Sequence, residues 1–264
     1  MLFNNQVALG QVKAMDFSNR AVAFLDILGF KTLIAKVENL DTDATVQFTE
    51  LLRILDNHVK YDNNQLQKNI PDEMLPKYLF ISDSLIISAP ESLDDYYGIA
   101  IVTLKAIEVA HKLLEIGLLV RGGIDVGSVW HDKYNIFGSG YVGAYQTEQQ
   151  ARHPCILLSK RASDKSKLLC SSSPLYDLST LWLSESGKTI VNTLHPSYIV
   201  DLEKYGREEH AFQVYRSTIV NTLENMTTEC SARNKWEWIA QFFNKAIKRH
   251  GVQSSPIKSF PFSE

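Results

Sequence analysis

We predict an α+β fold for this sequence, with a sheet-containing domain over residues 21–159 and a mainly helical extension over residues 160–264. Short, almost wholly apolar runs alternate with longer segments whose apolar residues recur at helical spacing. Two of these runs flank a three-residue polar turn, which is typical of a β-hairpin. After Ser159 the strand pattern gives way to a polar linker and then to helical patterns. Residues 1–20 form an N-terminal segment.

The elements of the sheet-containing domain follow the order β-α-β-β-α-β-β-α-β. We expect strands over residues 21–27, 78–81, 85–88, 118–129, 134–137 and 155–158. We expect helices over residues 42–61, 93–116 and 141–152, and a loop over residues 62–76. The first six elements have the split βαβ order of ferredoxin-like folds, and the remaining strands are additions to that core. In the extension we expect helices over residues 208–226 and 234–248.

The composition excludes several classes of protein. Of the 264 residues, 45% are hydrophobic and 22% are charged, which is ordinary for a globular chain. A net charge of -3 leaves no basic excess for a nucleic-acid backbone. Three widely spaced cysteines indicate neither a disulfide framework nor a zinc site. No apolar run approaches the roughly 20 residues of a membrane span. We therefore expect a cytoplasmic protein that binds neither nucleic acid nor membrane.

Two aspartates stand out from this pattern. Asp26 lies inside the apolar run 21–27, where a charged carboxylate is costly unless a cation compensates it. Asp83 lies at the tip of the predicted hairpin. In the ferredoxin-like order the first strand neighbours this hairpin, so both carboxylates can meet at one edge of the sheet and bind Mg²⁺ or Mn²⁺. The structural alternative for each is a helix cap or a turn contact.

A glycine follows Asp26 in the segment Leu28-Gly29-Phe30. Glycine lets backbone N–H groups approach phosphate oxygens just before a helix begins. Together with the two aspartates, this segment favours a site for a phosphate-containing ligand.

Four segments then match a known pattern: residues 24–30 (FLDILGF), 81–84 (ISDS), 120–127 (VRGGIDVG) and 134–138 (YNIFG). In this order they resemble motifs of the class III nucleotidyl cyclases, and more closely those of the bacterial pyrimidine-specific branch, the Pycsar cyclases. The resemblance covers residues 21–159 and implies the catalytic-domain fold of that family. It also implies that Asp26, Asp83 and the backbone carbonyl of Ile27 hold two Mg²⁺ or Mn²⁺ ions, while residues 28–30 bind the triphosphate.

The sequence departs from the purine-specific members of this family. Leu79 stands where those enzymes carry a lysine or glutamate, and Asn135 stands where adenylyl cyclases carry an aspartate that reads the base. Val142 and Gln146 replace the asparagine and arginine that act in the transition state, and Ser82 replaces a glycine. Because the Asn135 amide offers both a donor and an acceptor, it suits uracil or cytosine, with a lean toward the imide edge of uracil.

Arg121 is the nearest candidate for the missing catalytic cation. Lys160 and Arg161 are further candidates, although a surface salt bridge is the more ordinary role for both. The segment 235–244 of the extension also resembles the C-terminal part of cyclase-like proteins, and we assign it packing or dimer contacts. The tryptophans of the extension, Trp182, Trp236 and Trp238, are expected to pack.

The resemblance implies a pyrimidine nucleotide cyclase that converts UTP, or CTP, to the 3′,5′-cyclic monophosphate and pyrophosphate. It implies a homodimer with composite active sites and a separate effector protein that responds to the cyclic nucleotide during phage infection. One alternative is a catalytically silent cyclase-like domain that binds a nucleotide as a sensor. Another is a polymerase-palm-type nucleotidyltransferase, which the acidic net charge disfavours.

Overall fold

The computed structural model describes residues 16–65, 75–93, 96–172, 180–183, 187–199, 202–227, 230 and 232–258. Most of the N-terminal segment and residues 66–74 of the predicted loop lie outside this part of the chain. No helix among the described residues is long and apolar enough to span a membrane. All three cysteines are free, in agreement with the sequence analysis.

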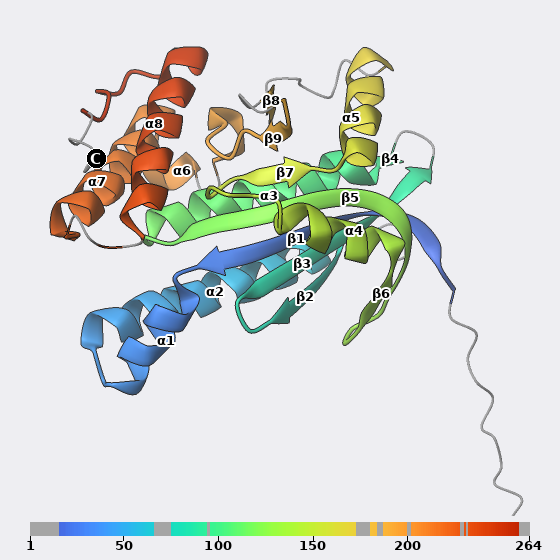
Figure 1. Cartoon of the computed structure of the whole chain (residues 1–264), viewed down its shortest axis with the longest axis horizontal. Coiled ribbons are helices and arrows are strands. Elements are labelled where there is room, and N and C mark those ends of the chain that lie inside the picture. Colours follow the sequence, from blue (N-terminus) through green and yellow to red (C-terminus); the bar gives the residue numbers. More distant parts are fainter. Residues whose placement is uncertain are drawn as a thin grey trace, which may run out of the picture.

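The described chain contains both strands and helices, with three helices in succession near its carboxy-terminal end (Figure 1). The strands are β1 (Ser18–Leu28), β2 (Lys77–Ile81), β3 (Ser84–Leu93), β4 (Tyr96–Tyr97), β5 (Leu119–His131), β6 (Ile136–Gly138), β7 (Ile156–Leu158), β8 (Leu181–Leu183) and β9 (Thr189–Val191). The helices are α1 (Phe30–Glu38), α2 (Thr42–Gln65), α3 (Gly98–Glu115), α4 (Ser139–Glu148), α5 (Lys160–Ser172), α6 (Leu202–Tyr205), α7 (Glu208–Asn225) and α8 (Arg233–His250), with a short 3₁₀ turn at Pro196–Tyr198.

The main sheet has the strand order β2-β3-β1-β5-β7-β9-β8, while β4 pairs with β3 and β6 pairs with β5. Strand β1 is antiparallel to both β3 and β5, and β7 runs parallel to β5. The order β2-β3-β1-β5 is that of a ferredoxin-like core, so the predicted α+β fold is confirmed. It places β1 at the centre of the core, between the hairpin β2–β3 and the long strand β5.

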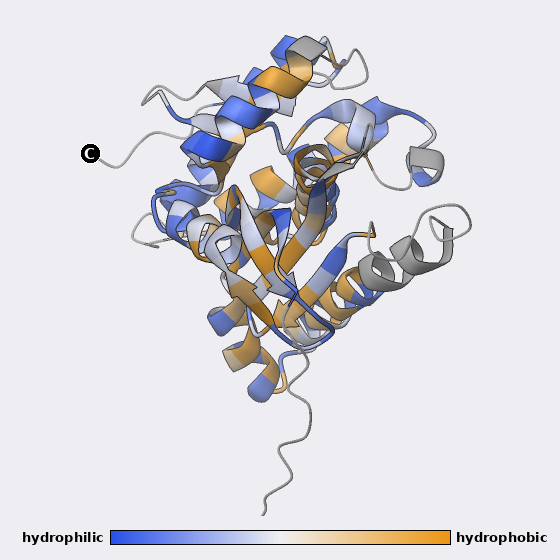
Figure 2. Ribbon diagram, turned by 90° about the vertical axis from the view of Figure 1, so that its right-hand side faces the viewer, coloured by the Kyte–Doolittle hydropathy of each residue, from blue (hydrophilic) through white to orange (hydrophobic). Residues whose placement is uncertain are grey.

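The alternation of β1 gives the sheet two different faces. Ala23 and Leu25 join the core that includes α3 and α2 on one face. Val22 and Phe24 pack with Ala144 of α4 on the other. Asp26 follows in the same alternation as Val22 and Phe24, so its side chain belongs to the α4 face. In Figure 2 the strands at the centre of the molecule are largely hydrophobic, as a sheet covered on both faces requires.

Glycines allow α4 to lie unusually close to β5. A Cβ atom on Gly123 would lie 2.2 Å from the carbonyl oxygen of Ala144, and one on Gly127 would lie 2.8 Å from the backbone nitrogen of Gly140. Neither distance is possible for a real side chain, so only glycine permits this crossing. The crossing brings the last residue of α4, Glu148, over the start of β5.

Three predicted helix boundaries differ from the structure by four or five residues. Helix α2 runs to Gln65 and so includes the first residues of the predicted loop, and α4 ends at Glu148 rather than at residue 152. Helix α3 begins at Gly98 rather than at residue 93, because the chain first completes the β3–β4 hairpin. The Glu91 carboxylate then accepts a hydrogen bond of 2.8 Å from the backbone N–H of Ile99 in the first turn of α3.

The predicted polar linker after Ser159 is instead helix α5. The Ser159 hydroxyl caps this helix by accepting a hydrogen bond of 3.1 Å from the backbone N–H of Ala162. Ala162 and Leu169 are buried, while most of the charged side chains lie outside. A narrow apolar stripe in a Ser- and Lys-rich segment is therefore sufficient for a helix here.

The carboxy-terminal part is mainly helical, but it also adds β8 and β9 to the sheet. Strand β9 pairs antiparallel with β7 and with β8, which the sequence analysis did not predict because both strands are only three residues long. Helices α7 and α8 enclose a second core around Phe212, Tyr215 and Phe243. The tryptophans pack as predicted: Trp236 is buried in this core, and Trp182 and Trp238 lie against Phe242.

Candidate active site

The structure brings the two predicted metal-binding aspartates to the same end of the sheet. Asp26 pairs in register with Ser84 of β3, the residue next to Asp83. The backbone N–H of Ile27 donates a hydrogen bond of 2.8 Å to the carbonyl oxygen of Asp83. The hairpin tip is thereby fixed against the carboxyl end of β1.

The Asp26 carboxyl is 19% exposed, and burial raises its pKa above the ordinary range. The Arg121 guanidinium opposes this rise in pKa, whereas the negative charges of Glu148 and Asp83 add to it. Burial is thus the main reason that the ionised form of Asp26 is disfavoured, and the positive charges of Arg121 and Lys235 offset only part of this effect.

Arg121 lies in register opposite Asp26 on β5 and forms two ion pairs. Its Nη2 atom lies 3.1 Å from Oδ2 of Asp26, and its Nε atom lies 2.5 Å from Oε1 of Glu148. Glu148 is only 1% exposed, and the Gln149 side chain donates a hydrogen bond of 2.5 Å to its other oxygen. Arg121 therefore connects Asp26 at the sheet edge to the end of α4.

Sequence reasoning missed Glu148. The available signal was a single acidic residue in the second half of the predicted helix 141–152, and many surface helices carry one there. Only the close approach of α4 to β5 turns this glutamate inward, toward Arg121.

The turn after β1 has the features expected of a phosphate-binding backbone. Gly29 is the N-cap of α1 and has φ 86°, and a Cβ atom placed there would meet nothing within 4 Å. No side chain caps α1, and its first turn contains no acidic residue. The N–H groups of this first turn therefore lack a side-chain acceptor beside an open space, which favours an anion.

The side chains around this turn are used for packing. Ile27 is buried on the α3 face, and Leu28 packs against the core of the carboxy-terminal part. The Phe30 ring lies 6.4 Å from that of Phe48 in α2. These three residues can therefore offer only backbone groups to a ligand.

The two predicted base-reading residues lie in different places. Leu79 is half-buried on the α4 face of β2, beside the core formed by Phe24 and Ile86. Asn135 is exposed in the turn before β6, where the Asp132 carboxylate accepts hydrogen bonds from the backbone N–H groups of Tyr134 and Asn135. The amide of Asn135 remains at the surface of that turn.

Within one chain, Asn135 lies far from Asp26. Strand β5 runs ten residues from Arg121, opposite Asp26, to His131, opposite Ile136 of β6. At about 3.3 Å per residue, this is a path of roughly 33 Å. Figure 1 likewise shows β6 at the opposite end of β5 from the carboxyl end of β1. One chain therefore does not bring the Asn135 turn to its own aspartates.

The donors at the sheet edge fit a hard cation. Among the described residues, no group of three or more His, Cys, Asp and Glu side chains is arranged to hold a metal ion. The edge offers instead two carboxylates, those of Asp26 and Asp83, together with backbone oxygens. Such an all-oxygen donor set is what Mg²⁺ and Mn²⁺ prefer, and the raised pKa of Asp26 indicates a carboxylate that a cation would stabilise.

No protein-family model and no curated protein matches this sequence. Solved structures with similar folds include cyclases and a cyclase-like protein. The guanylyl cyclase Cya2 is 16% identical, with 68% of this chain and 92% of that chain covered and a TM-score of 0.43. A class III adenylyl cyclase-like ATP-binding protein from Pseudomonas aeruginosa is 12% identical, with 75% and 40% covered and a TM-score of 0.41.

A third structure of this kind is the catalytic core of a rhodopsin-guanylyl cyclase with converted specificity, in complex with ATPalphaS. It is 14% identical, with 66% of this chain and 96% of that chain covered and a TM-score of 0.39. All three TM-scores lie below 0.5.

The other candidate cations are engaged away from the aspartates. Lys160 forms an exposed ion pair of 3.3 Å with Asp164, as expected for a surface salt bridge. Arg161 pairs at 2.5 Å with Asp125, which is buried and also accepts a hydrogen bond from Ser159. Arg161 therefore compensates a buried carboxylate.

Val142 and Gln146, the residues in place of the transition-state asparagine and arginine, are both exposed on α4. Within one chain, neither side chain lies where it could replace the asparagine and arginine that the family resemblance implies.

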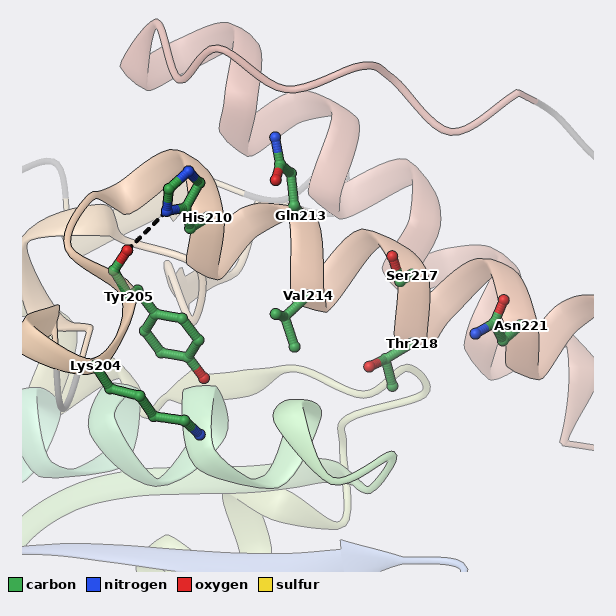
Figure 3. Close-up of a pocket in the computed structure, with 8 residues that line it drawn as sticks. All are labelled: Lys204, Tyr205, His210, Gln213, Val214, Ser217, Thr218 and Asn221. Atoms are coloured by element: carbon green, nitrogen blue, oxygen red, sulfur yellow. Dashed lines mark hydrogen bonds between the residues drawn. The ribbon is translucent and has the colours of Figure 1, made fainter.

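Two hollows lie in the carboxy-terminal part. A shallow one of about 440 Å³ is formed by α6 and α7 (Figure 3). Its Lys204 side chain forms an ion pair with Glu115 of α3, and the His210 ring is hydrogen-bonded to the Tyr205 carbonyl oxygen. A larger cavity of about 1100 Å³ lies between α8 and the segment that follows α4. Neither includes Asp26 or Asp83 in its lining.

Proposed function

We propose that this chain is a nucleotidyl cyclase. In the reaction the ribose 3′-oxygen of a nucleoside triphosphate forms a bond to the α-phosphorus, and the bond from that phosphorus to the β-bridging oxygen breaks. Pyrophosphate leaves, and the hydroxyl proton passes to water. The observation that carries this proposal is the meeting of Asp26 and Asp83 at the sheet edge, beside Arg121 and the open glycine turn.

The residues of this edge divide the task between them. Asp26, Asp83 and the Ile27 backbone carbonyl would hold two Mg²⁺ or Mn²⁺ ions, which supply activation of the 3′-hydroxyl and neutralisation of the phosphate charge. The free N–H groups at the start of α1 bind the β and γ oxygens, next to the open space at Gly29.

Arg121 stabilises the negative charge that develops on the phosphates. In this structure it is paired with Asp26, and Glu148 holds its other side. Glu148 therefore keeps the guanidinium at the site when Asp26 turns to a cation.

We further propose that the substrate base is a pyrimidine, with UTP favoured over CTP. Leu79 has no hydrogen-bonding group with which to read a purine edge, and the exposed Asn135 amide offers a donor and an acceptor that suit the imide of uracil. The roughly 33 Å path between the aspartate edge and the Asn135 turn supports a site completed by a second copy of the chain.

Exposed apolar side chains support the same homodimer. Several belong to the hairpin edge, the β6 region and α4: Ile81, Phe137, Val142 and Tyr145. Burying them against a partner would remove apolar surface from water. By resemblance to the Pycsar cyclases, the cyclic nucleotide would act in the cytoplasm on a separate effector protein during phage infection.

Incubation of the purified protein with Mn²⁺ and each of the four ribonucleoside triphosphates tests this proposal. Chromatography with mass detection should show 3′,5′-cyclic UMP as the main product, with less cyclic CMP and stoichiometric pyrophosphate. Asp26→Asn should make neither. If none of the four nucleotides yields a cyclic product, the chain is not a cyclase.

A catalytically silent nucleotide-binding domain is the second candidate. It is favoured by the exposed Val142 and Gln146 at the positions where the family resemblance implies an asparagine and an arginine. Metal-dependent binding of a triphosphate without any turnover would select this alternative.

A further inference from the structure

The lining of the larger cavity in the carboxy-terminal part includes none of the proposed catalytic, metal-binding or substrate-binding residues. It has a volume of about 1100 Å³ and is lined by α8, by residues 150–155 after α4, and by the strands β7, β8 and β9. We propose that this α8 cavity is a second ligand site, which binds a nucleoside phosphate. This goes beyond the proposed cyclase activity and does not depend on it.

The charge of the lining favours an anion. Four cationic side chains, Arg152, Lys188, Lys245 and Arg249, line the α8 cavity against a single carboxylate, Glu237. The cations come from three separate segments, and Lys245 and Arg249 lie one helical turn apart on the same face of α8. The whole chain has a net charge of -3, so these four cations form a local basic site. A site of this kind can hold a few phosphate groups.

The aromatic lining favours a planar base beside these phosphates. The Trp238 ring stacks on Phe242 at 5.0 Å and on His153 at 5.5 Å between ring centroids, with interplanar angles of 14° and 5°. Phe242 is buried, Trp238 is half-buried and His153 is exposed, so His153 is the outermost ring of the stack. A nucleobase can extend this stack or replace His153 in it.

Trp182 provides a second aromatic wall. Its ring lies 4.6 Å from that of Phe242, and the Arg249 guanidinium lies 5.1 Å from its centroid. The Arg249 guanidinium thereby adds its positive charge to the aromatic wall of the same cavity. Aromatic faces and phosphate-binding cations thus line the same cavity.

The α8 cavity also adjoins the candidate active site through the chain itself. Residues 150–155 begin two positions after Glu148, which holds Arg121. The backbone N–H of Gly122 donates a hydrogen bond of 3.1 Å to the carbonyl oxygen of Cys155, a residue of the lining. A ligand in the α8 cavity would therefore contact the segment that follows Glu148 and so could change the position of Arg121. Such a ligand would be a regulatory nucleotide.

Tryptophan fluorescence tests the site without any catalysis. The Asp26→Asn chain is titrated with UTP, UMP, cyclic UMP and inorganic triphosphate in the presence of a metal chelator. We expect saturable quenching by at least one nucleotide, because the base stacks beside Trp182 and Trp238. The quenching should persist in Trp130→Phe, whose ring is on β5, and should fall in Trp238→Phe. Because neither metal nor turnover is involved, failure of the cyclase proposal would leave this result unchanged.

Charge variants on α8 localise the ligand. Lys245→Gln/Arg249→Gln should weaken nucleotide binding at least 10-fold, with an unchanged circular dichroism spectrum. Lys248→Gln is the matched control, because Lys248 is an exposed cation of the same helix outside the lining. The proposal is overturned if no nucleotide quenches saturably at millimolar concentration, if Lys248→Gln weakens binding equally, or if inorganic triphosphate binds as tightly as every nucleotide.

Discussion

Arg121 of β5 joins Asp26 of β1 to Glu148 of α4, at 3.1 Å and 2.5 Å respectively. Both carboxylates and the guanidinium lie on the face of the sheet that α4 covers. The arginine thus compensates the aspartate that is the first candidate for a metal ligand, and a buried glutamate fixes its position. Several expected outcomes follow from this arrangement and from the fold that creates it.

Replacing either aspartate by asparagine should abolish catalysis while preserving the fold. Asp26→Asn and Asp83→Asn keep the side-chain shape but remove the charge that holds a divalent cation, so we expect losses on the order of 10³-fold in cyclisation rate. Initial rates with Mn²⁺ measure this loss. Asp164→Asn, an exposed carboxylate paired with Lys160, should retain full activity. An active Asp26→Asn enzyme would contradict the metal assignment.

A double substitution can separate the catalytic role of Arg121 from its structural role. Arg121→Gln leaves Glu148 buried without its cation, which should lower the free energy of unfolding by about 3 kcal/mol and the rate on the order of 10²-fold. Arg121→Gln/Glu148→Gln should regain most of the stability but none of the rate. Urea unfolding and initial rates report the two quantities. Recovery of the wild-type rate in the double variant would make Arg121 a purely structural residue.

The close crossing of α4 over β5 should not tolerate a side chain at Gly123. Gly123→Ala puts a Cβ atom 2.2 Å from the Ala144 carbonyl oxygen, so α4 must shift, at a cost of about 3 kcal/mol. The shift also moves Glu148 away from Arg121, so activity should fall with stability. Gly206→Ala is the control: its site is open and only its φ of 71° is unfavourable, which costs about 1 kcal/mol. Equal unfolding midpoints for the two variants would contradict this account.

Two buried histidines should make the protein less stable in mild acid. Burial lowers the pKa of His111 to about 4, and burial with the nearby charges of Arg20 and Lys77 lowers the pKa of His131 to about 4. Both values lie below the unfolded pKa of about 6.5, so the unfolded chain binds more protons between pH 6.5 and 4. The free energy of unfolding should therefore decrease as the pH is lowered from 6.5 to 4.

From pH 7 to pH 5 the expected loss is about 2 kcal/mol for each histidine. Urea unfolding at the two pH values measures it. His111→Asn keeps a donor for the His195 carbonyl oxygen, which the His111 ring contacts at 3.0 Å, but it removes the titration. Its loss of stability between these pH values should therefore be smaller. An identical slope would show that His111 is not one of the responsible groups.

A composite active site predicts complementation between two impaired chains. Asp26→Asn damages the metal edge of one chain, and Asn135→Ala damages the base-reading turn that would serve the partner. Random pairing in an equal mixture makes half of the dimers mixed, each with one intact site, so about a quarter of wild-type activity should return. Rates of the mixture and of each variant alone test this. A mixture no more active than the average of its components would place the whole site in one chain.

The sequence alone identified the features that depend on a local pattern. Asp26 is conspicuous because a charge inside an apolar strand needs a compensating group, and Asp83 because it occupies a hairpin tip. The strand order of the core also follows from the pattern of apolar runs, and the register of β1 with β3 places Asp26 opposite Ser84, the residue next to Asp83. Gly29, at the start of α1, has the positive φ that such a turn requires.

Other features were decided only by the tertiary structure. Helix α5 looked like a linker because its stability comes from a cap and two buried residues rather than from a broad apolar face. Strands β8 and β9 are too short to have a pattern of their own, and they exist through pairing with β7.

The partnership of Arg121 with Glu148 is the clearest case. It joins residues far apart in the sequence and requires glycines at the crossing of α4 and β5. No local periodicity records such a contact, because its energy arises only when two separately formed elements pack closely enough to exclude water.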